Sequence, residues 1–383
     1  MNDSTDPLAA YRDLFVSSPD VVAYLDGNSL GRPLKASVER VSAFMTEQWG
    51  GRLIRGWDEG WMQQAQAIGD DLGRVVLGAA AGQTTIGDST TVLLYKLVRA
   101  AVAATDRREI VIDRDNFPTD RYVLEGVADE LGLTLRWIEA GDVTVDRIPL
   151  GPQTALVVLS HVSYRSGYLA DMAGITAAVH EAGALVLWDL CHSAGVIPTE
   201  LDAWNVDLAV GCSYKYLNGG PGAPAFAYVA QRHHGLRQPI QGWLGSQRPF
   251  EMGQGYEPAD GIRRFLSGTP PVIGALPMRD MVALIEQVGL PAVRAKSIAL
   301  TSFALELVDA LPVEVSTPRD PERRGSHVTI EHPRFEELMP QLWAQGVIPD
   351  FRRPSGIRLG LSPLSTSFAE VEVGVRAIGE LLR

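Results

Sequence analysis

Between about residues 85 and 230, short apolar runs alternate with stretches in which apolar residues have helical spacing. Short apolar runs predict strands at 110–113, 134–138, 155–160, 185–190, 208–211 and 223–230. Stretches with helical spacing lie between them at 121–131 and 175–182, and Gly183 ends the second. Continuous apolar strands separated by amphipathic helices indicate a mainly parallel sheet covered by helices on both faces. This block is therefore predicted to be a large α/β domain.

A different pattern follows this block. The segment 242–277 is rich in glycine and proline and breaks the alternation, and one long helical pattern then runs from 276 towards 311. Beyond it the pattern predicts strands at 313–316, 327–331 and 357–361, and helices at 334–345 and 368–381. We expect three parts: a large domain, a smaller α+β domain at the C-terminal end, and an N-terminal segment that joins the smaller one. Their predicted bounds are 51–275, 276–383 and 1–50.

Composition narrows the class of protein. Hydrophobic residues make up 46% of the 383 positions and charged residues 21%, which argues against disorder and coiled coil. A net charge of −12 repels phosphate backbones, so no nucleic-acid partner is expected. No apolar run reaches the roughly 18–20 residues that span a bilayer, and residues 1–6 are polar where a secretory signal is basic and then apolar. We therefore expect a cytoplasmic protein without membrane contact.

Cysteine and histidine usage predicts no metal site. The two cysteines, Cys191 and Cys212, form neither a disulfide framework nor a zinc cluster by themselves, and both are expected to be small buried apolar residues. The adjacent histidines His233 and His234 resemble a solvated turn.

Polar residues stand where two predicted strands end, which is where open α/β sheets bind ligands. Asp189 ends one apolar run, His192 follows it, and Lys215 comes directly after the next strand. Alone, such an acid often caps a loop, and such a lysine is more often a surface residue. Together, an acid and a lysine at two strand ends are what a pyridoxal-phosphate enzyme needs. The lysine forms a Schiff base with the cofactor, and the acid holds a proton on the pyridine nitrogen.

A phosphate group needs backbone N–H groups at a helix N-terminus together with hydroxyls. Thr90 and Thr91 follow Asp88 and Ser89 directly ahead of a periodic apolar run at 92–98, and supply both. The alternative is an ordinary helix N-cap.

Longer motifs around these residues resemble kynureninase, a family of fold type I pyridoxal-phosphate enzymes in the aminotransferase class V group. The resemblance rests on blocks distributed along nearly the whole chain, at 24–31, 116–120, 164–167, 188–195, 213–222, 242–245, 267–271 and 356–358. The blocks around Asp189 and Lys215 are shared in part with cysteine desulfurases. Ser163 stands where many members of the family carry asparagine, and Cys191 where serine is common.

The resemblance implies a fold, a reaction and an assembly. The expected fold is a mainly parallel seven-stranded sheet between helices, with a smaller α+β domain. The expected reaction is hydrolysis of the β,γ carbon–carbon bond of L-kynurenine, or of its 3-hydroxy form, to anthranilate (or 3-hydroxyanthranilate) and L-alanine. The expected cofactor is pyridoxal 5′-phosphate, and the expected assembly is a homodimer with shared active sites.

The resemblance also implies roles for single residues. Lys215 is the Schiff-base lysine and proton shuttle, Asp189 the partner of the pyridine nitrogen, and Tyr214 a phosphate ligand and proton relay. Arg358 is implied to bind the substrate α-carboxylate, where its planar fork gives bidentate contact. Further cofactor contacts are implied for Thr90, Thr91, Phe117, Pro118, Thr119, Asp120, Ser160 and His192. Trp243 and Thr269 match cofactor and substrate contacts that the neighbouring subunit provides.

Alternatives stay open at this point. Taken singly, Phe117 fits a core position, Trp243 a packing position and Arg358 a surface ion pair. A cysteine desulfurase or C–S lyase would use the same Lys215 and Asp189, although a desulfurase needs a cysteine in a C-terminal loop and none follows Cys212. A non-catalytic binding or scaffold relative is the other rival.

Overall fold

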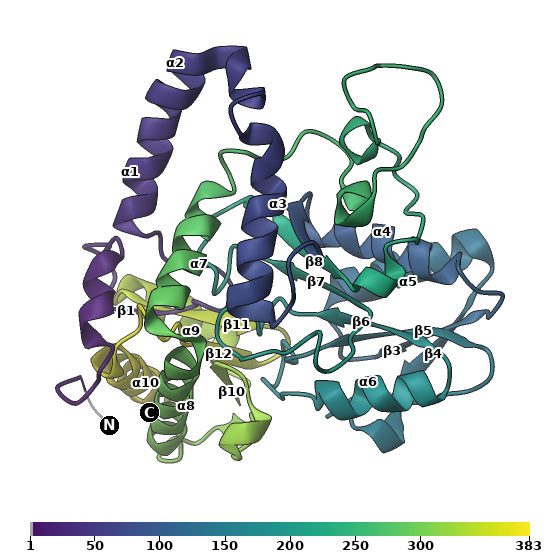
Figure 1. The fold of residues 1–383 in the computed structure, drawn as a ribbon. Coiled ribbons are helices and arrows are strands. Elements are labelled where there is room, and N and C mark those ends of the chain that lie inside the picture. The colour runs from purple at the N-terminus through teal and green to yellow at the C-terminus, as the bar shows by residue number, and fades with distance from the viewer. Residues whose placement is uncertain (1–2) are drawn as a thin grey trace.

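The computed structural model describes residues 3–383 and contains two sheets (Figure 1). The larger sheet has seven strands in the order β2-β8-β7-β6-β5-β3-β4. Its strands are β2 (Thr84–Gly87), β3 (Glu109–Asp113), β4 (Thr134–Ile138), β5 (Thr154–Ser160), β6 (Leu185–Asp189), β7 (Leu208–Cys212) and β8 (Ala225–Val229). Strands β3 to β7 pair in parallel, and β8 runs antiparallel to both β7 and β2. The predicted mainly parallel seven-stranded sheet is confirmed.

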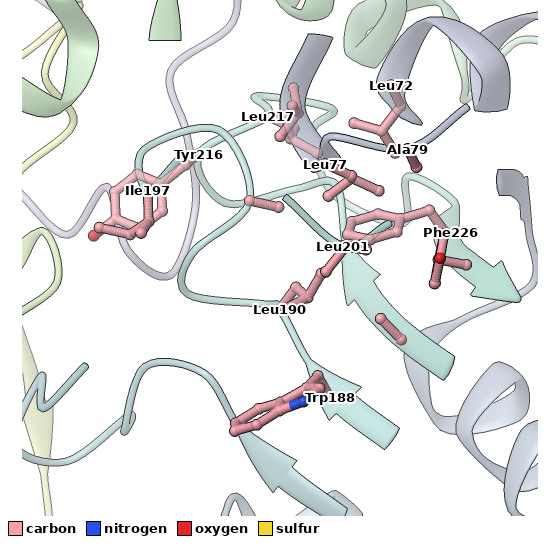
Figure 2. Packing of buried hydrophobic residues seen from close by; sticks show 14 of the residues in the cluster. Leu72, Leu77, Ala79, Trp188, Leu190, Ile197, Leu201, Tyr216, Leu217 and Phe226 are labelled. Carbon is pink, nitrogen blue, oxygen red and sulfur yellow. The ribbon is translucent and has the colours of Figure 1, made fainter. Parts of the chain in front are cut away.

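Apolar side chains alternate between the two faces of this sheet. Leu187 packs in one cluster with helices α4 (Thr90–Val102) and α5 (Pro118–Leu131), while the neighbouring Trp188 packs in a cluster on the other face with α6 (Met172–Glu181). Figure 2 shows Trp188, Leu190 and Phe226 within that second cluster. Because both faces are covered, every residue of β7 is buried, and this strand is apolar throughout.

The smaller sheet has five strands in the order β1-β11-β12-β10-β9. They are β1 (Ala23–Leu25), β9 (Glu314–Val315), β10 (His327–Glu331), β11 (Val347–Arg352) and β12 (Gly356–Gly360). Helices α9 (Phe335–Ala344) and α10 (Phe368–Leu382) contact it. Strand β1 pairs in parallel with β11, so the N-terminal segment contributes an edge strand to this sheet. The division of the chain at residues 50 and 275 stays a prediction.

Three helices lie between β1 and β2: α1 (Lys35–Ala43), α2 (Gly50–Arg52) and α3 (Trp61–Leu72). Figure 1 shows them as a hairpin whose far end, at α2, lies away from both sheets. The apolar pattern did not predict these helices.

The single helix expected over 276–311 is wrong. The structure has α7 (Leu276–Val288) and α8 (Leu290–Val308), which meet at an angle of 90°. Gly289 lies between them with φ +85°, a conformation that glycine adopts at little cost, and Pro291 lies in the first turn of α8, where its missing N–H is harmless. Apolar spacing continues on both sides of the bend, which is why the pattern resembled one helix. Among residues 3–383 no single helix meets the length and hydropathy needed to cross a bilayer, and α7 and α8 do so only as this bent pair.

Three strands, β1, β2 and β11, were not predicted, and the reason is identifiable for two of them. Strand β11 contains Pro349, and a proline inside an apolar run argues against a strand. Strand β2 is four residues long and contains two threonines, so its apolar signal is weak. Helix α5 begins at Pro118, three residues before its predicted start, which places Pro118, Thr119 and Asp120 in its first turn.

Candidate active site

Neighbouring parallel strands bring the candidate residues to one edge of the large sheet. Asp189 ends β6, Ser160 ends β5, and the two stand opposite each other in register. Lys215 follows the end of β7, which is the next strand along. The carboxyl ends of three adjacent strands therefore carry the acid, the hydroxyl and the amine.

Lys215 lies at the centre of the group. Its side chain is buried, and Nζ lies 2.9 Å from Nε2 of His192. The same Nζ lies 5.8 Å from the ring centroid of Phe117 and 5.8 Å from that of Tyr214. The structure therefore brings His192, Phe117 and Tyr214 around the amine.

The loop before α5 supplies a second set of contacts. The Asn116 side-chain oxygen accepts from Ser160 Oγ at 3.0 Å and from the Phe117 N–H at 2.7 Å, which fixes the loop against β5. Phe117 stands edge-on to Tyr164, with ring centroids 5.3 Å apart. Pro118 and Thr119 begin the helix, both half-buried.

Asp120 is almost fully buried in the first turn of α5. Burial raises the pKa of its carboxyl well above the usual range, and the charges of Asp189 and Asp113 add to this, whereas the Lys215 ammonium opposes it. Asp120 and Asp189 therefore share one electrostatic environment with Lys215.

Helix α4 begins at the same edge. Ser89 caps it by accepting from the Val92 N–H at 3.4 Å. Thr90, in the first turn, has its hydroxyl 3.8 Å from the Cys191 sulfur, and Thr91 beside it is exposed. Buried Lys96 pairs with Asp88 and donates to the Phe265 carbonyl at 3.1 Å, which holds the loop before the helix. The helix N-terminus, with its unpaired N–H groups, faces the strand ends.

Arg358 reaches the group from β12 of the small sheet. Its guanidinium pairs with Asp350, donates from Nη1 to the Tyr164 carbonyl at 2.8 Å and from Nη2 to Ser29 Oγ at 3.1 Å. These contacts hold the fork in place, and Nη1 keeps one further N–H. Arg358 is buried, so it is not the surface ion pair that was the alternative.

Two predicted residues do not join the group. Trp243 packs against Trp57 and Phe250, with ring centroids 6.3 Å and 5.8 Å away, and Thr269 is exposed. No contact recorded within residues 3–383 joins either residue to Lys215 or Asp189. Within one chain, both lie outside the predicted site.

Several residues in the site were not predicted. Ser29 and Asp350 hold Arg358, and Asn116 holds the Phe117 loop. A Cβ atom at Gly31 would lie 2.4 Å from the Lys215 carbonyl oxygen, and the Gly31 N–H donates to the Tyr214 carbonyl at 2.9 Å, so this glycine lets the N-terminal segment pack on the lysine turn. Ser29 and Gly31 lie within the motif at 24–31, but the motif alone did not indicate a role for either residue.

His327 on β10 is the other unpredicted residue. It is fully buried, both of its ring nitrogens lack a hydrogen-bond partner, and its ring centroid lies 5.6 Å from that of His192. Burial lowers the pKa of both imidazoles well below the usual range, and the cationic charges of Lys215 and Arg358 add to this. Both rings are therefore neutral at physiological pH.

The residues present fit pyridoxal phosphate. Three buried polar atoms around Lys215 lack a partner: Asp120 Oδ2, Asn116 Nδ2 and His192 Nδ1. Such atoms are costly unless a ligand contacts them. An amine, a strand-end carboxylate, an aromatic face and a helix N-terminus with a hydroxyl are the donor set for its aldehyde, pyridine nitrogen, ring and phosphate. Within residues 3–383, no cluster of three or more histidine, cysteine or acidic side chains has the geometry of a metal site.

Comparisons with known proteins agree with this geometry. A family model described as the kynureninase C-terminal domain matches residues 293–378. A kynureninase from Pseudomonas fluorescens is 42% identical over 393 aligned residues, covering 99% of this chain and 94% of that protein. A kynureninase from Burkholderia pseudomallei (strain 1106a) is 41% identical with the same coverage.

Solved structures show the same fold at low identity. The apo cysteine desulfurase from Thermococcus onnurineus NA1 superposes with a TM-score of 0.84 at 18% identity, over 100% of this chain and 99% of that one. The cysteine desulfurase CsdA from Escherichia coli gives a TM-score of 0.85 at 16% identity, over 98% and 99% of the two chains. The expected fold type I architecture is confirmed.

Proposed function

The chain belongs to the kynureninase family, and on that premise we propose that it hydrolyses the β,γ carbon–carbon bond of L-kynurenine, giving anthranilate and L-alanine, with pyridoxal 5′-phosphate as cofactor. The observation that carries the proposal is the buried Lys215 amine at the strand ends, surrounded by His192, Phe117 and Tyr214. Desolvation of this kind suits an amine that acts as a nucleophile and a base. The proposed location is the cytoplasm.

When bound, the cofactor supplies an electron sink for the charge that develops at the substrate α- and β-carbons. Lys215 binds the cofactor and moves the proton at the α-carbon. Asp189 holds a proton at the pyridine nitrogen, and its orientation is fixed because Oδ1 accepts from the Cys191 N–H at 2.7 Å. Phe117 would contact the ring, and Asp120, Ser160 and His192 would supply polar contacts to it.

Other residues orient the substrate and control protons during cleavage. Thr90 and Thr91 at the start of α4, with Tyr214, hold the phosphate. Arg358 binds the α-carboxylate through its free N–H, pre-positioned by Asp350 and Ser29. Water adds to the γ-carbonyl, and Tyr214 passes a proton during release of the anthranilate fragment. One water is consumed for each anthranilate and alanine formed.

An apolar surface supports a homodimer. Five aromatic rings form a row from the helical hairpin to the loop after β8, in the order Phe44, Trp61, Trp57, Trp243 and Phe250, with centroids 5.5–6.3 Å apart. Ile54 is 76% exposed at the end of the hairpin, and Met252 is 75% exposed in the loop. Exposed apolar side chains beside a row of aromatic rings are typical of a subunit interface. A second copy would cover it and bring Trp243 and Thr269 to the partner's site.

A C–S lyase is less well supported. The desulfurase structures are 16–18% identical to this chain, which shows the fold alone. A desulfurase also needs a cysteine in a C-terminal loop, and none follows Cys212.

The test is a substrate panel with purified protein and added pyridoxal phosphate. We expect anthranilate from L-kynurenine or 3-hydroxyanthranilate from 3-hydroxykynurenine, little sulfide from L-cysteine, and a loss of multiple turnover of about 10³-fold or more in Lys215→Ala. Sulfide from cysteine without either aromatic product would refute the proposal. Near-normal turnover by Lys215→Ala would refute the role of the lysine.

A further inference from the structure

The two cysteines lie close together where two neighbouring strands end: Cys212 is the last residue of β7, and Cys191 lies in the turn two residues after β6. Strands β6 and β7 pair in parallel with Leu187 opposite Leu208 and Asp189 opposite Val210. The Leu190 N–H donates to the Val210 carbonyl at 2.8 Å, so the pairing continues past the end of β6. Cys191 follows in the turn, and its thiol is in hydrogen-bond contact with that of Cys212.

Both thiols lie on the face of the sheet that α4 covers. Leu208 and Val210 belong to the apolar cluster on that face, and alternation along β7 points Cys212 to the same face. Contacts agree: the Cys191 sulfur lies 3.8 Å from Thr90 Oγ1, and the Cys212 sulfur lies 3.8 Å from the Cys191 carbonyl oxygen. Adjacent strands are about 4.8 Å apart, which is within the Cα separation of about 4.4–6.8 Å that a disulfide spans.

The pKa values of the two thiols are shifted in opposite directions. Burial raises the pKa of Cys212, but a hydrogen bond from the Cys191 thiol and the Lys215 charge outweigh it, and the pKa is lowered overall. The pKa of Cys191 is raised well above its usual value by that hydrogen bond and by burial. Cys212 is thus the better nucleophile, with Cys191 in place as its resolving partner. Both are buried free thiols: Cys212 is 3% exposed and Cys191 is 8% exposed. Only small reagents therefore reach them.

We propose that Cys191 and Cys212 form a modification site that reacts with a hydroperoxide and closes into an intrachain disulfide. The Cys212 thiolate attacks one peroxide oxygen, the O–O bond breaks, and the alcohol or water fragment leaves with a proton. The Cys191 sulfur then attacks the Cys212 sulfenic acid, the S–O bond breaks, and water leaves. Both sulfurs are oxidised, and the peroxide is reduced by two electrons.

The disulfide would change the surroundings of the phosphate site. Oxidation removes the thiol beside Thr90 and the thiol that contacts the Tyr214 hydroxyl. Both hydroxyl residues are proposed phosphate ligands, so the oxidised chain should retain the cofactor less well. This consequence rests on the proposed function, whereas formation of the disulfide does not.

The test is treatment of the purified holoprotein and of cofactor-free protein with hydrogen peroxide, followed by thiol titration under denaturing conditions. We expect the count to fall from two thiols per chain to none, faster without cofactor. Mass spectrometry should give a monomeric chain about 2 Da lighter and a Cys191–Cys212 cross-linked peptide, both reversed by dithiothreitol. Two retained thiols, cross-links between chains only, or oxidation to sulfinic acid without the cross-link would overturn the proposal.

Matched variants identify the nucleophile. Cys191→Ser should accumulate a sulfenic acid at Cys212 that dimedone traps, whereas Cys212→Ser should give little adduct at Cys191. Equal trapping in both variants would contradict the assigned order. Cofactor retention after ultrafiltration is measured separately: a complete disulfide with unchanged retention overturns the link to the phosphate site. The thiol and mass readouts do not depend on kynurenine hydrolysis, so the two proposals fail independently.

Discussion

Asp189 has two roles, accepting from a backbone N–H and holding the proposed proton at the pyridine nitrogen, and one substitution removes only the second. Its Oδ1 accepts from the Cys191 N–H, and an asparagine keeps that acceptor. An amide does not hold the proton of a pyridine nitrogen, so Asp189→Asn should keep the fold and lose about 10²-fold or more in kcat. Steady-state kinetics and thermal unfolding decide the question together. If the variant turns over like the parent, Asp189 is not the partner of the ring nitrogen.

His327 gives a prediction in which stability and activity change in opposite directions. A fully buried imidazole without partners costs about 1–3 kcal/mol, so His327→Leu should unfold at a temperature about 1–3 °C higher. Its position beside His192, between the charges of Lys215 and Arg358, predicts that kcat/KM falls at least about tenfold.

His327→Gln is the matched control. It keeps a neutral donor and acceptor and should retain activity within about tenfold of the parent. Equal kcat/KM in the leucine and glutamine variants would show that the imidazole plays no part in the reaction.

Single residues also show how far the sequence alone could predict the site. Lys215 and Asp189 were predictable because strand ends are local features and the two strands are neighbours. Ser29 and Arg358 are 329 positions apart and meet because β1 and β12 are brought into one sheet, so no local pattern identifies the pair. Buried His327 lies in an apolar strand and resembles a core residue until its unpaired nitrogens are visible.

Among the elements, Asp207 joins three parts of the large sheet. Its carboxylate pairs with His180 of α6 and with Arg232 and His233, which follow β8, and accepts from the Val186 N–H of β6 at 2.9 Å. The expectation that His233 and His234 form a solvated turn is therefore wrong: both are half-buried, His233 is part of this network, and the His234 ring lies 3.1 Å from the Val229 carbonyl oxygen. One buried carboxylate thus fixes a helix and a turn to the sheet.

This network predicts a pH dependence of stability. Burial raises the pKa of Asp207, but the hydrogen bonds from His233, Val186, His180 and Arg232 outweigh it and lower the pKa from 3.8 to about 2. A lowered pKa stabilises the fold above the unfolded value, and this contribution is lost as the pH falls from about 4 to about 2. Asp207→Ala should therefore lower the free energy of unfolding at pH 7 by about 2–3 kcal/mol.

Urea unfolding at pH 7 and near pH 3 measures this change in the free energy of unfolding. Asp146→Ala, at an exposed position, is the control. An Asp207→Ala variant as stable as the control would contradict the account.

The helices and strands also show which features the apolar pattern predicts and which it misses. Strands β3 to β8 were predicted within two residues at each end because both faces of the sheet are covered and their apolar runs are continuous. The bend at Gly289 was missed because apolar spacing is preserved through it, and the hairpin of α1 to α3 because its exposed apolar side chains blur the two-faced pattern.

For the whole molecule, the proposed homodimer with shared sites predicts complementation between two inactive variants. The Lys215→Ala subunit lacks the amine but has an intact Trp243. The Trp243→Ala subunit has the amine but lacks the tryptophan. Mixed subunits, unfolded and refolded together in equal amounts, should form heterodimers with one complete site, giving on the order of a quarter of the parental activity from near-inactive parents. Activity no greater than the sum of the two variants would place each site within one chain. Light scattering of each variant checks that the dimer forms.

The reaction itself is tested most directly by product analysis in ¹⁸O-labelled water. Purified protein with pyridoxal phosphate and L-kynurenine should give equal amounts of anthranilate and L-alanine. The anthranilate carboxylate should carry at least one oxygen from the solvent, because the bond is cleaved after water adds to the γ-carbonyl. Lys215→Ala should give neither product under multiple turnover. Anthranilate without solvent oxygen, alanine without anthranilate, or no product from L-kynurenine and its 3-hydroxy form would contradict hydrolytic carbon–carbon cleavage.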